Sequence, residues 1–250
     1  MTSHTPISVI MPVFQGEPYI GEALRSLLDQ SLPPAEIVVV DDGSTDGSVE
    51  VVQSLVQSLG ATAEVPRVQI VHRANGGPAA ARNTGLAAAR HDLIAFHDAD
   101  DLAHTGWLEM AARRLTSDPT LTGVIGRQEV LIEPGAAVPI WNRAPADTTE
   151  GAVPAGVHIM NMVVRRAAFD LVGGFDESMR LGEDTDLLLR MIDSGLRMEF
   201  VDDVVVSRRV HHFNLTHDAE GLRRAQFEIL ARRIRRRKAC LLYTSPSPRD

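Results

Sequence analysis

Between residues 7 and 97 the sequence alternates between short apolar runs and segments in which apolar residues recur with helical spacing. One run, Glu36-Ile-Val-Val-Val-Asp41, is β-branched and apolar at every inner position, which is typical of a strand buried on both faces at the centre of a parallel sheet. We therefore expect an α/β fold with a doubly wound, mostly parallel sheet flanked by helices, in a single large domain.

The predicted elements cover most of the chain. The first strand is expected to stop at Pro12. The strands of the first half are Ile7–Met11, Glu36–Asp41, Val68–His72 and Leu93–His97, and the helices between them lie at 16–31, around 52–59 and at 77–89. The second half is expected to contain a helix at 106–115, a strand at 122–133, a loop with Pro134, Pro139, Pro145 and Pro154, helices near 166–172 and 182–194, an extended segment at 198–211, and a helix from about 219 to 238.

Composition limits the function classes. The chain has 250 residues and 44% apolar content, enough for a substantial core. It has no run of about 18 uncharged apolar residues and no basic-then-apolar N-terminus, so we expect a cytoplasmic protein that is not exported. Residues 1–222 carry 16 Lys and Arg against 31 acids, which argues against a nucleic-acid partner.

Two acidic clusters follow predicted strands. Asp98-Ala-Asp100 places two carboxylates on alternate, same-facing positions of an extended backbone, with Asp101 turned elsewhere. Such oxygen ligands suit a hard divalent cation; the alternative is a solvated acidic loop. Asp41-Asp42 precedes a Gly-Ser-Thr turn that lets a flat ligand approach the backbone, or is simply a turn and helix cap. Strand carboxyl ends are where ligands bind in open α/β sheets.

Four further positions carry chemistry that the residues alone leave open. Arg82 follows a glycine-bearing helix start and suits an anionic diphosphate, although a solvated surface arginine is the common case. Glu183 and Asp184 begin a helix, where acids complement the helix dipole or, facing a pocket, accept a proton. His211 or His212 can complete a metal site or be an ordinary packed histidine.

Lysine is nearly absent: Lys238 is the one Lys among 25 cationic residues. Receiver domains and haloacid-dehalogenase-like phosphatases also place aspartates at strand ends, but both need an active-site lysine, and so does the G-x-x-x-x-G-K-[ST] phosphate loop. The sequence therefore disfavours all three classes.

Taken in order, these segments resemble the family 2 glycosyltransferases, which are inverting enzymes of the GT-A fold. The matching stretches cover nearly the whole chain up to Thr216, and several motifs in one order are more specific than any single motif. They are Val9-Ile-Met-Pro-Val-Phe14, Val39-Val-Asp-Asp-Gly-Ser-Thr-Asp46, Asn75 to Gly85, Phe96-x-Asp-Ala-Asp-Asp101, Gly173-Gly-Phe-Asp-Glu177, Glu183-Asp184 with Arg190, and Arg209-x-His-x-x-Asn-x-Thr216.

The resemblance implies metal-dependent transfer of a sugar, with inversion, from a nucleoside diphosphate donor to a hydroxyl acceptor. The donor is expected to be a UDP-sugar, the cofactor Mn²⁺ or Mg²⁺, and the acceptor a saccharide or lipid-linked molecule of cell-surface polysaccharide or glycolipid synthesis. The residues implied are Asp184 as general base; Pro12, Phe14, Asp41, Asp42, Arg82 and Asp98 for the donor; Gly174, Phe175 and Glu183 on the acceptor side; and Asp100 and His211 for the metal.

The resemblance also divides the chain. Residues 1–115 form the donor half, 116–222 the acceptor-binding and catalytic half of the same domain, and 223–239 a basic C-terminal helix. Residues 240–250 (CLLYTSPSPRD) have no link to what precedes them and are expected to be a non-native tail, or a native disordered one.

Three interpretations stay open. A sugar-phosphate nucleotidyltransferase shares the broad fold but would be expected to show a basic Gly-rich loop where this chain has Pro12-Val-Phe-Gln-Gly16. A protein that binds nucleotide-sugar without turnover has no distinguishing sequence feature. The basic run Arg232–Lys238 is either a solvated helix end or a peripheral contact with anionic lipid at the inner face of the membrane.

Overall fold

The computed structural model describes residues 5–60, 66–136 and 158–244. Pro139, Pro145 and Pro154 of the predicted loop lie outside these residues. The elements are β1 (Ile7–Val13), α1 (Ile20–Leu28), β2 (Glu36–Asp41), α2 (Ser48–Leu59), β3 (Arg67–His72), α3 (Pro78–Ala88), β4 (Leu93–Phe96), β5 (Leu102–Ala103), α4 (Trp107–Ser117), β6 (Gly123–Ile132), η2 (Ile159–Asn161), β7 (Met162–Arg165), α5 (Ala167–Val172), α6 (Glu183–Asp193), β8 (Met198–Val210), η3 (Leu215–His217) and α7 (Ala219–Thr244).

The strands form one curled mixed sheet in the order β3-β2-β1-β4-β7-β6-β8-β5. Strands β1 to β4 pair in parallel, as the sequence predicts. β7 is antiparallel to both β4 and β6, so β6 and its parallel neighbour β8 run in the same direction as β1. The carboxyl ends of β1, β2, β4, β6 and β8 therefore share one edge of the sheet.

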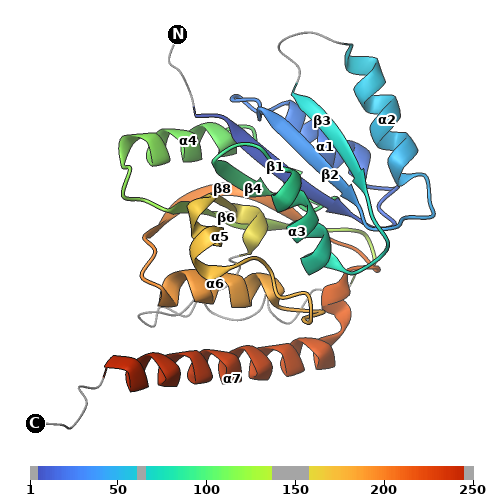
Figure 1. Cartoon of the computed structure of the whole chain (residues 1–250). Coiled ribbons are helices and arrows are strands. Elements are labelled where there is room, and N and C mark those ends of the chain that lie inside the picture. The colour runs from blue at the N-terminus through green and yellow to red at the C-terminus, as the bar shows by residue number, and fades with distance from the viewer. Residues whose placement is uncertain (1–4, 61–65, 137–157, 245–250) are drawn as a thin grey trace, which may run out of the picture.

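Helices cover both faces of the sheet (Figure 1). The core on one face contains apolar residues of α1, α2 and α4, and the core on the other face contains those of α3, α5 and α6. Gly85 lets α3 lie close to the sheet, because an added Cβ would come within 2.3 Å of Ile10 Cγ2 and 3.2 Å of Val40 Cγ2. This close approach fixes the helix that carries Arg82.

The first strand runs past its predicted end. β1 continues through Pro12 to Val13, and Pro12 pairs in register with Val40 of β2. The pairing of β1 with β4 ends at Ile10 and Phe96. Since backbone polar groups point alternately to the two neighbours, the missing N–H of Pro12 falls on the side that β4 no longer reaches. The expected stop at Pro12 was wrong for this reason.

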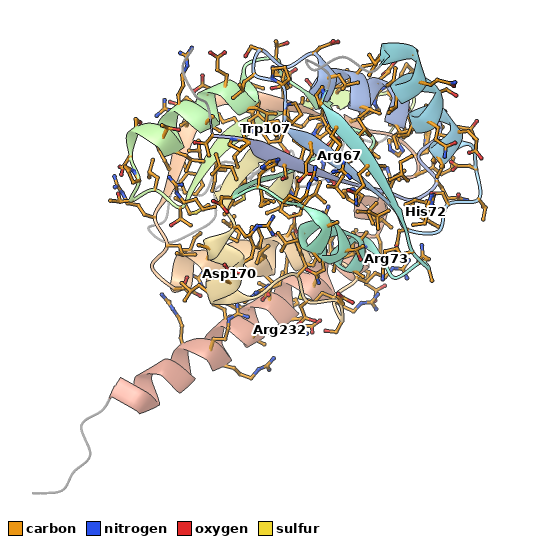
Figure 2. All side chains as sticks on the ribbon, turned by 45° about the horizontal axis from the view of Figure 1, so that its top comes forward. Arg67, His72, Arg73, Trp107, Asp170 and Arg232 are labelled. Carbon is orange, nitrogen blue, oxygen red and sulfur yellow. The ribbon has the colours of Figure 1, made fainter. Side chains whose placement is uncertain are left out.

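Helix α7 lies along α6 on the side away from the sheet (Figure 1). Its buried residues Ala225 and Ile229 face the body. Four arginines of α7 pair with acids of the body, and Figure 2 shows one of them, Arg232, at the junction. The pairs are Arg232 with Asp176, Arg233 and Arg237 with Asp193, and Arg236 with Asp186.

α7 continues to Thr244, into the segment expected to be a tail, while residues 245–250 lie outside the described part of the chain. Within the described residues, no helix combines the length and apolar character needed to cross a bilayer.

Candidate active site

Five segments bring polar side chains to the shared carboxyl edge. β2 ends at Asp41, β4 is followed by the acidic turn 98–101, and β8 leads to His211. Because β7 runs antiparallel to these strands, its amino end lies at the same edge, and His158 precedes it. The start of α6 adds Glu183 and Asp184.

The acidic segment after β4 is a turn rather than extended chain. The Asp101 N–H donates to the Asp98 carbonyl at 3.3 Å. The turn brings one carboxylate oxygen each from Asp98, Asp100 and Asp101 within 4.8 Å of one another. The prediction that Asp101 is turned elsewhere was therefore wrong, because it assumed the alternation of a strand.

His211 joins this cluster from the end of β8. Its Nε2 lies 3.0 Å from Asp100 Oδ2, and its ring stacks on Tyr19 with 4.4 Å between centroids. The Phe213 N–H donates to Nδ1 at 3.2 Å, which leaves Nε2 as the ring nitrogen that faces Asp100. Asn214 Nδ2 also donates to Asp100 Oδ2 at 3.1 Å. His212 is exposed, so His211 is the histidine of the predicted pair that joins the site.

These groups fit a divalent ion. The carboxylates of the turn are oxygen ligands of the kind that Mg²⁺ and Mn²⁺ prefer, and an imidazole nitrogen converges on Asp100 beside them. Asp101 Oδ2 is buried without a hydrogen-bond partner among the described residues. Burial, then the charges of Asp100 and Asp98, raise the Asp101 pKa well above its usual value. An ion bound here would relieve both the repulsion and the unsatisfied oxygen.

The buried Arg82 side chain links the acidic turn to the start of α6. Its guanidinium donates to Asp98 Oδ1 at 2.9 Å and to Glu183 Oε1 at 2.5 Å. It also lies over the Phe175 ring, 5.6 Å from the centroid. Burial opposes its charge, but Asp98, Glu183 and Asp184 outweigh burial and raise its pKa. The predicted diphosphate role stays a prediction, and in this structure Arg82 neutralises two carboxylates.

Glu183 and Asp184 have opposite electrostatic surroundings. Burial raises the pKa of Glu183 to about 7; Arg82 lowers it and the Asp184 charge adds to the rise. Burial also opposes the charge of Asp184, but the hydrogen bond from His158, the Arg82 charge and the Thr185 N–H lower the Asp184 pKa. Asp184 is therefore ionised at neutral pH and keeps some access to solvent, with 17% of its side chain exposed.

Four of the predicted donor residues lie at the ends of β1 and β2, namely Pro12, Phe14, Asp41 and Asp42. Asp41 accepts hydrogen bonds from the Ser44 N–H at 2.8 Å and from His72 Nδ1 at 3.0 Å, and these outweigh burial and lower its pKa. Asp42 is 3% exposed and holds Arg73 and the N–H groups of Gly76 and Gly77. Figure 2 shows His72 and Arg73 at the end of β3.

Phe14 is 54% exposed just beyond β1, and Pro12 is half-buried. An exposed aromatic ring beside a carboxylate-rich strand edge is a surface on which a flat nucleobase can stack.

The segment Gly173–Glu177 is anchored from two helices. Arg190 of α6 donates to the carbonyls of Val172 and Gly174, at 2.6 and 2.7 Å. Asn83 of α3 accepts from the Phe175 N–H and donates to its carbonyl. Phe175 is 4% exposed and packs against Phe96. The Arg82 guanidinium lies over the Phe175 ring. A Cβ added at Gly174 would lie 2.5 Å from Asn83 Oδ1, and Glu183 pairs with Arg82. Acceptor contact stays a prediction for this segment.

The fold brings to the site several residues to which no sequence pattern assigned a role. His158 Nδ1 lies 3.2 Å from Asp184 Oδ2, and Arg208 Nη1 lies 3.1 Å from His158 Nε2. Arg209 donates through its backbone N–H to Asp101 Oδ1 at 2.8 Å. Asn214, which donates to Asp100, belongs to the motif from Arg209 to Thr216, so the sequence did point to it. His158 lies in a segment with no recognisable pattern.

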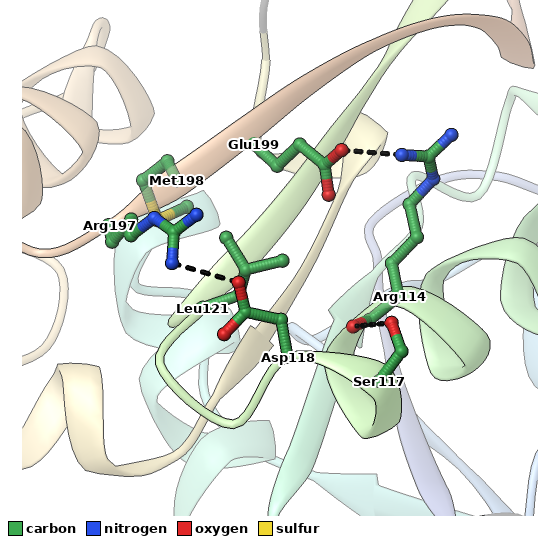
Figure 3. A pocket seen from close by; sticks show the side chains of 7 residues that line it. All are labelled: Arg114, Ser117, Asp118, Leu121, Arg197, Met198 and Glu199. Carbon is green, nitrogen blue, oxygen red and sulfur yellow. Dashed lines mark hydrogen bonds and ion pairs between the residues drawn. The ribbon is translucent and has the colours of Figure 1, made fainter.

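A hollow of about 330 Å³ lies elsewhere, between the end of α4 and the start of β8 (Figure 3). It is lined by two internal ion pairs, Arg197 with Asp118 at 2.8 Å and Arg114 with Glu199. Because β8 begins there, the hollow lies at the opposite edge of the sheet from the acidic turn. Its charges neutralise one another, so it is not the candidate site.

The fold is that of GT-A glycosyltransferases. The structure of residues 1–349 of S. aureus TarS in complex with UDP-GlcNAc superposes with a TM-score of 0.68 over 85% of this chain and 61% of that 1–349 chain, at 22% identity. Residues 8–169 match the family described as Glycosyl transferase family 2. The chain therefore belongs to glycosyltransferase family 2.

Curated relatives carry consistent names. The chain is 34% identical over 212 residues to a pre-mycofactocin glycosyltransferase of Mycobacterium tuberculosis, covering 79% of this chain and 41% of that protein. It is 27% identical to the glycosyltransferase EpsJ of Bacillus subtilis, covering 84% of this chain and 62% of EpsJ. It is 24% identical to a hyaluronan synthase of Pasteurella multocida, covering 95% of this chain and 24% of the synthase. The chain thus spans about two fifths to three fifths of the first two relatives.

Proposed function

We propose that this chain is a metal-dependent, inverting glycosyltransferase that moves a sugar from a UDP-sugar to a hydroxyl group of a saccharide or lipid-linked acceptor. The observation that carries the proposal is the convergence of Asp98, Asp100 and His211 at the sheet edge that also presents Asp184. Family membership supports the reaction class. The same membership disfavours the nucleotidyltransferase alternative.

Each group has a role that its surroundings allow. Asp98, Asp100 and His211 would hold Mn²⁺ or Mg²⁺, with Asp101 completing the turn. A bound divalent ion supplies electrostatic stabilisation of the negative charge that develops on the leaving diphosphate. Asp184, ionised and partly exposed, would accept the proton of the attacking acceptor hydroxyl. Attack from the face opposite the leaving group inverts the anomeric carbon.

The UDP donor is proposed on two grounds. The TarS structures were determined with UDP and with UDP-GlcNAc, so this fold accommodates that nucleotide. In this chain, the exposed Phe14 ring and the carboxylates Asp41 and Asp42 offer a stacking surface and hydrogen-bond acceptors at the ends of β1 and β2. A nucleobase imide and ribose hydroxyls are donors that match these acceptors.

The direct test is a panel of nucleotide-sugars, each incubated with the purified chain and Mn²⁺ or Mg²⁺. We expect slow release of UDP from one UDP-sugar, and a rise in melting temperature with that donor when metal is present. Binding without any release of nucleotide would favour the non-catalytic binding protein. Absence of both binding and release across the panel would contradict the proposal.

Helix α7 supports a peripheral membrane position at the inner face of the membrane. Phe227, Leu230 and Ile234 are 75%, 54% and 47% exposed and recur at helical spacing along one stripe. Arg223 and Arg235 are exposed on the same helix. An apolar stripe flanked by arginines suits the surface of an anionic bilayer, where a lipid-linked acceptor would be presented.

We predict that the chain co-sediments with vesicles containing phosphatidylglycerol and not with neutral phosphatidylcholine vesicles. Phe227→Gln with Ile234→Gln should remove most of this binding, because the stripe loses its apolar contact area. Phe200→Gln on β8, at a residue that is 46% exposed, is the matched control and should bind as the parent does. Equal sedimentation of the parent with both vesicle types would rule out the lipid contact.

A further inference from the structure

We propose that His158 and Arg208 form a hydrogen-bonded relay that positions Asp184 and holds its carboxylate in the orientation needed to take a proton. The inference rests on the proposed function, in which Asp184 is the general base. It assigns a role to two residues that no motif of the chain identified. Both are positioning residues, since they act through Asp184.

The direction of each hydrogen bond follows from side-chain chemistry. A guanidinium has donors and no acceptor, so the 3.1 Å contact from Arg208 Nη1 requires a lone pair on His158 Nε2. The ring proton must then lie on Nδ1, where it points at Asp184 Oδ2, 3.2 Å away. Arg208 thereby selects the neutral Nδ1–H tautomer, and that tautomer donates to Asp184.

Three elements contribute to the relay, so its geometry depends on the fold. Arg208 belongs to β8 and is 8% exposed, His158 precedes η2, and Asp184 lies in the first turn of α6. The second oxygen of Asp184 accepts the Thr185 N–H at 2.7 Å. With one oxygen fixed by its own helix and the other by His158, the carboxylate cannot rotate freely. Its remaining lone pairs stay available to an acceptor hydroxyl.

The relay also gives Asp184 a different hydrogen-bond partner from that of Glu183. Arg82 pairs with Glu183 and Asp98, at 2.5 and 2.9 Å, whereas His158 hydrogen-bonds to Asp184. Two adjacent carboxylates thus have different partners on different elements. A base held in place by a neutral donor keeps its charge, whereas direct pairing with an arginine would occupy the same lone pairs with a cation.

The first test compares three side chains at position 158 using the UDP-sugar that the parent hydrolyses. His158→Asn keeps an N–H donor near the Nδ1 position, and His158→Leu removes it at similar volume. We expect His158→Leu to lower kcat by about 10- to 100-fold with donor KM little changed, because a misplaced base affects the chemical step. His158→Asn should recover most of that loss. Equal loss in both variants, or a change confined to KM, would overturn the proposal.

The second test asks whether Arg208 acts through His158. Arg208→Met should lower kcat in the parent but have little further effect in the His158→Asn background, because asparagine has no tautomer to select. Equal effects in both backgrounds would contradict the relay.

A third measurement does not depend on activity. Nitrogen-15 chemical shifts of the histidine rings, with His158 assigned by its loss in His158→Asn, should show the neutral Nδ1–H form in the parent. Arg208→Met should shift the population toward Nε2–H or the protonated ring. A parent ring protonated on Nε2 would refute the inference even if every variant were inactive.

Failure of the relay and failure of the proposed function give different results. If Asp184→Asn abolishes turnover while His158→Leu remains fully active, the relay is wrong and the base assignment stands. If Asp184→Asn turns over sugar at the parent rate, the base assignment itself is wrong. Circular dichroism and melting temperature of each variant identify any loss caused by misfolding.

Discussion

Asp184→Asn should retain donor binding while its kcat falls by about 10²- to 10⁴-fold, the range that a positioned general base contributes. The substitution keeps the shape of the side chain and its acceptor for the Thr185 N–H, but an amide cannot accept the proton of an attacking hydroxyl. Donor affinity, measured by titration with UDP in the presence of Mn²⁺, should change little. Asp184 lies on α6 and hydrogen-bonds to His158 and Thr185, whereas the predicted donor residues lie at the ends of β1, β2 and β4 and, for Arg82, on α3.

Asp193→Asn at the other end of α6 is the matched control, since Asp193 pairs with Arg233 of α7 and lies away from the cluster. It should keep the parental kcat. Glu183 is the competing base, because burial raises its pKa to about 7, near the optimum for proton transfer. Parental turnover in Asp184→Asn together with its loss in Glu183→Gln would assign the base to Glu183.

Arg82→Met should destabilise the fold by about 3–5 kcal/mol, the usual cost of removing one partner of a buried ion pair. The Arg82 side chain is 7% exposed and neutralises Glu183, itself 7% exposed, as well as Asp98. Methionine fills similar volume, so the loss reflects the two acids left without their cation rather than a cavity. Urea unfolding followed by circular dichroism measures the change.

Arg67→Met on the exposed end of β3 (Figure 2) is the control and should change stability by less than about 0.5 kcal/mol. Arg82→Met combined with Glu183→Gln should recover part of the lost stability, because one of the two carboxylates left without a cation is also removed. If Arg82→Met unfolded with the same free energy as the parent, the charge of Arg82 would not stabilise the site.

The sequence could predict the part of the site that lies at the carboxyl ends of parallel strands. The sequence predicted β2 and β4 correctly, and parallel strands necessarily bring their carboxyl ends to one edge. Asp41, Asp98 and Asp100 therefore all lie at this edge, and the turn after β4 brings Asp98 and Asp100 close together. The extended segment predicted at 198–211 is β8, which delivers His211 to the same edge.

Other features depend on pairings that local pattern does not encode. β7 has four residues, too few for a periodic signal, yet its antiparallel placement sets the direction of β6 and β8. The partners of Arg82 are 16 and 101 residues away in sequence.

The ion pairs of the basic helix α7 also could not be predicted from local sequence pattern. The sequence left the run 232–238 open between a solvated helix end and a lipid contact, whereas Arg232, Arg233, Arg236 and Arg237 pair with acids of the body. Charge complementarity between an acidic body and a basic helix was visible in the sequence, but its geometry was not.

The central claim is that acidic side chains from separate parts of the chain converge on an ion that holds a diphosphate. The most direct measurement is calorimetric titration of UDP into the purified chain with Mn²⁺ and with EDTA, for the parent and Asp100→Asn, with Asp118→Asn as the control. The account predicts binding that requires Mn²⁺ and is weakened at least about tenfold in Asp100→Asn, with Asp118→Asn unchanged. Equal UDP affinity in Mn²⁺ and in EDTA would contradict it.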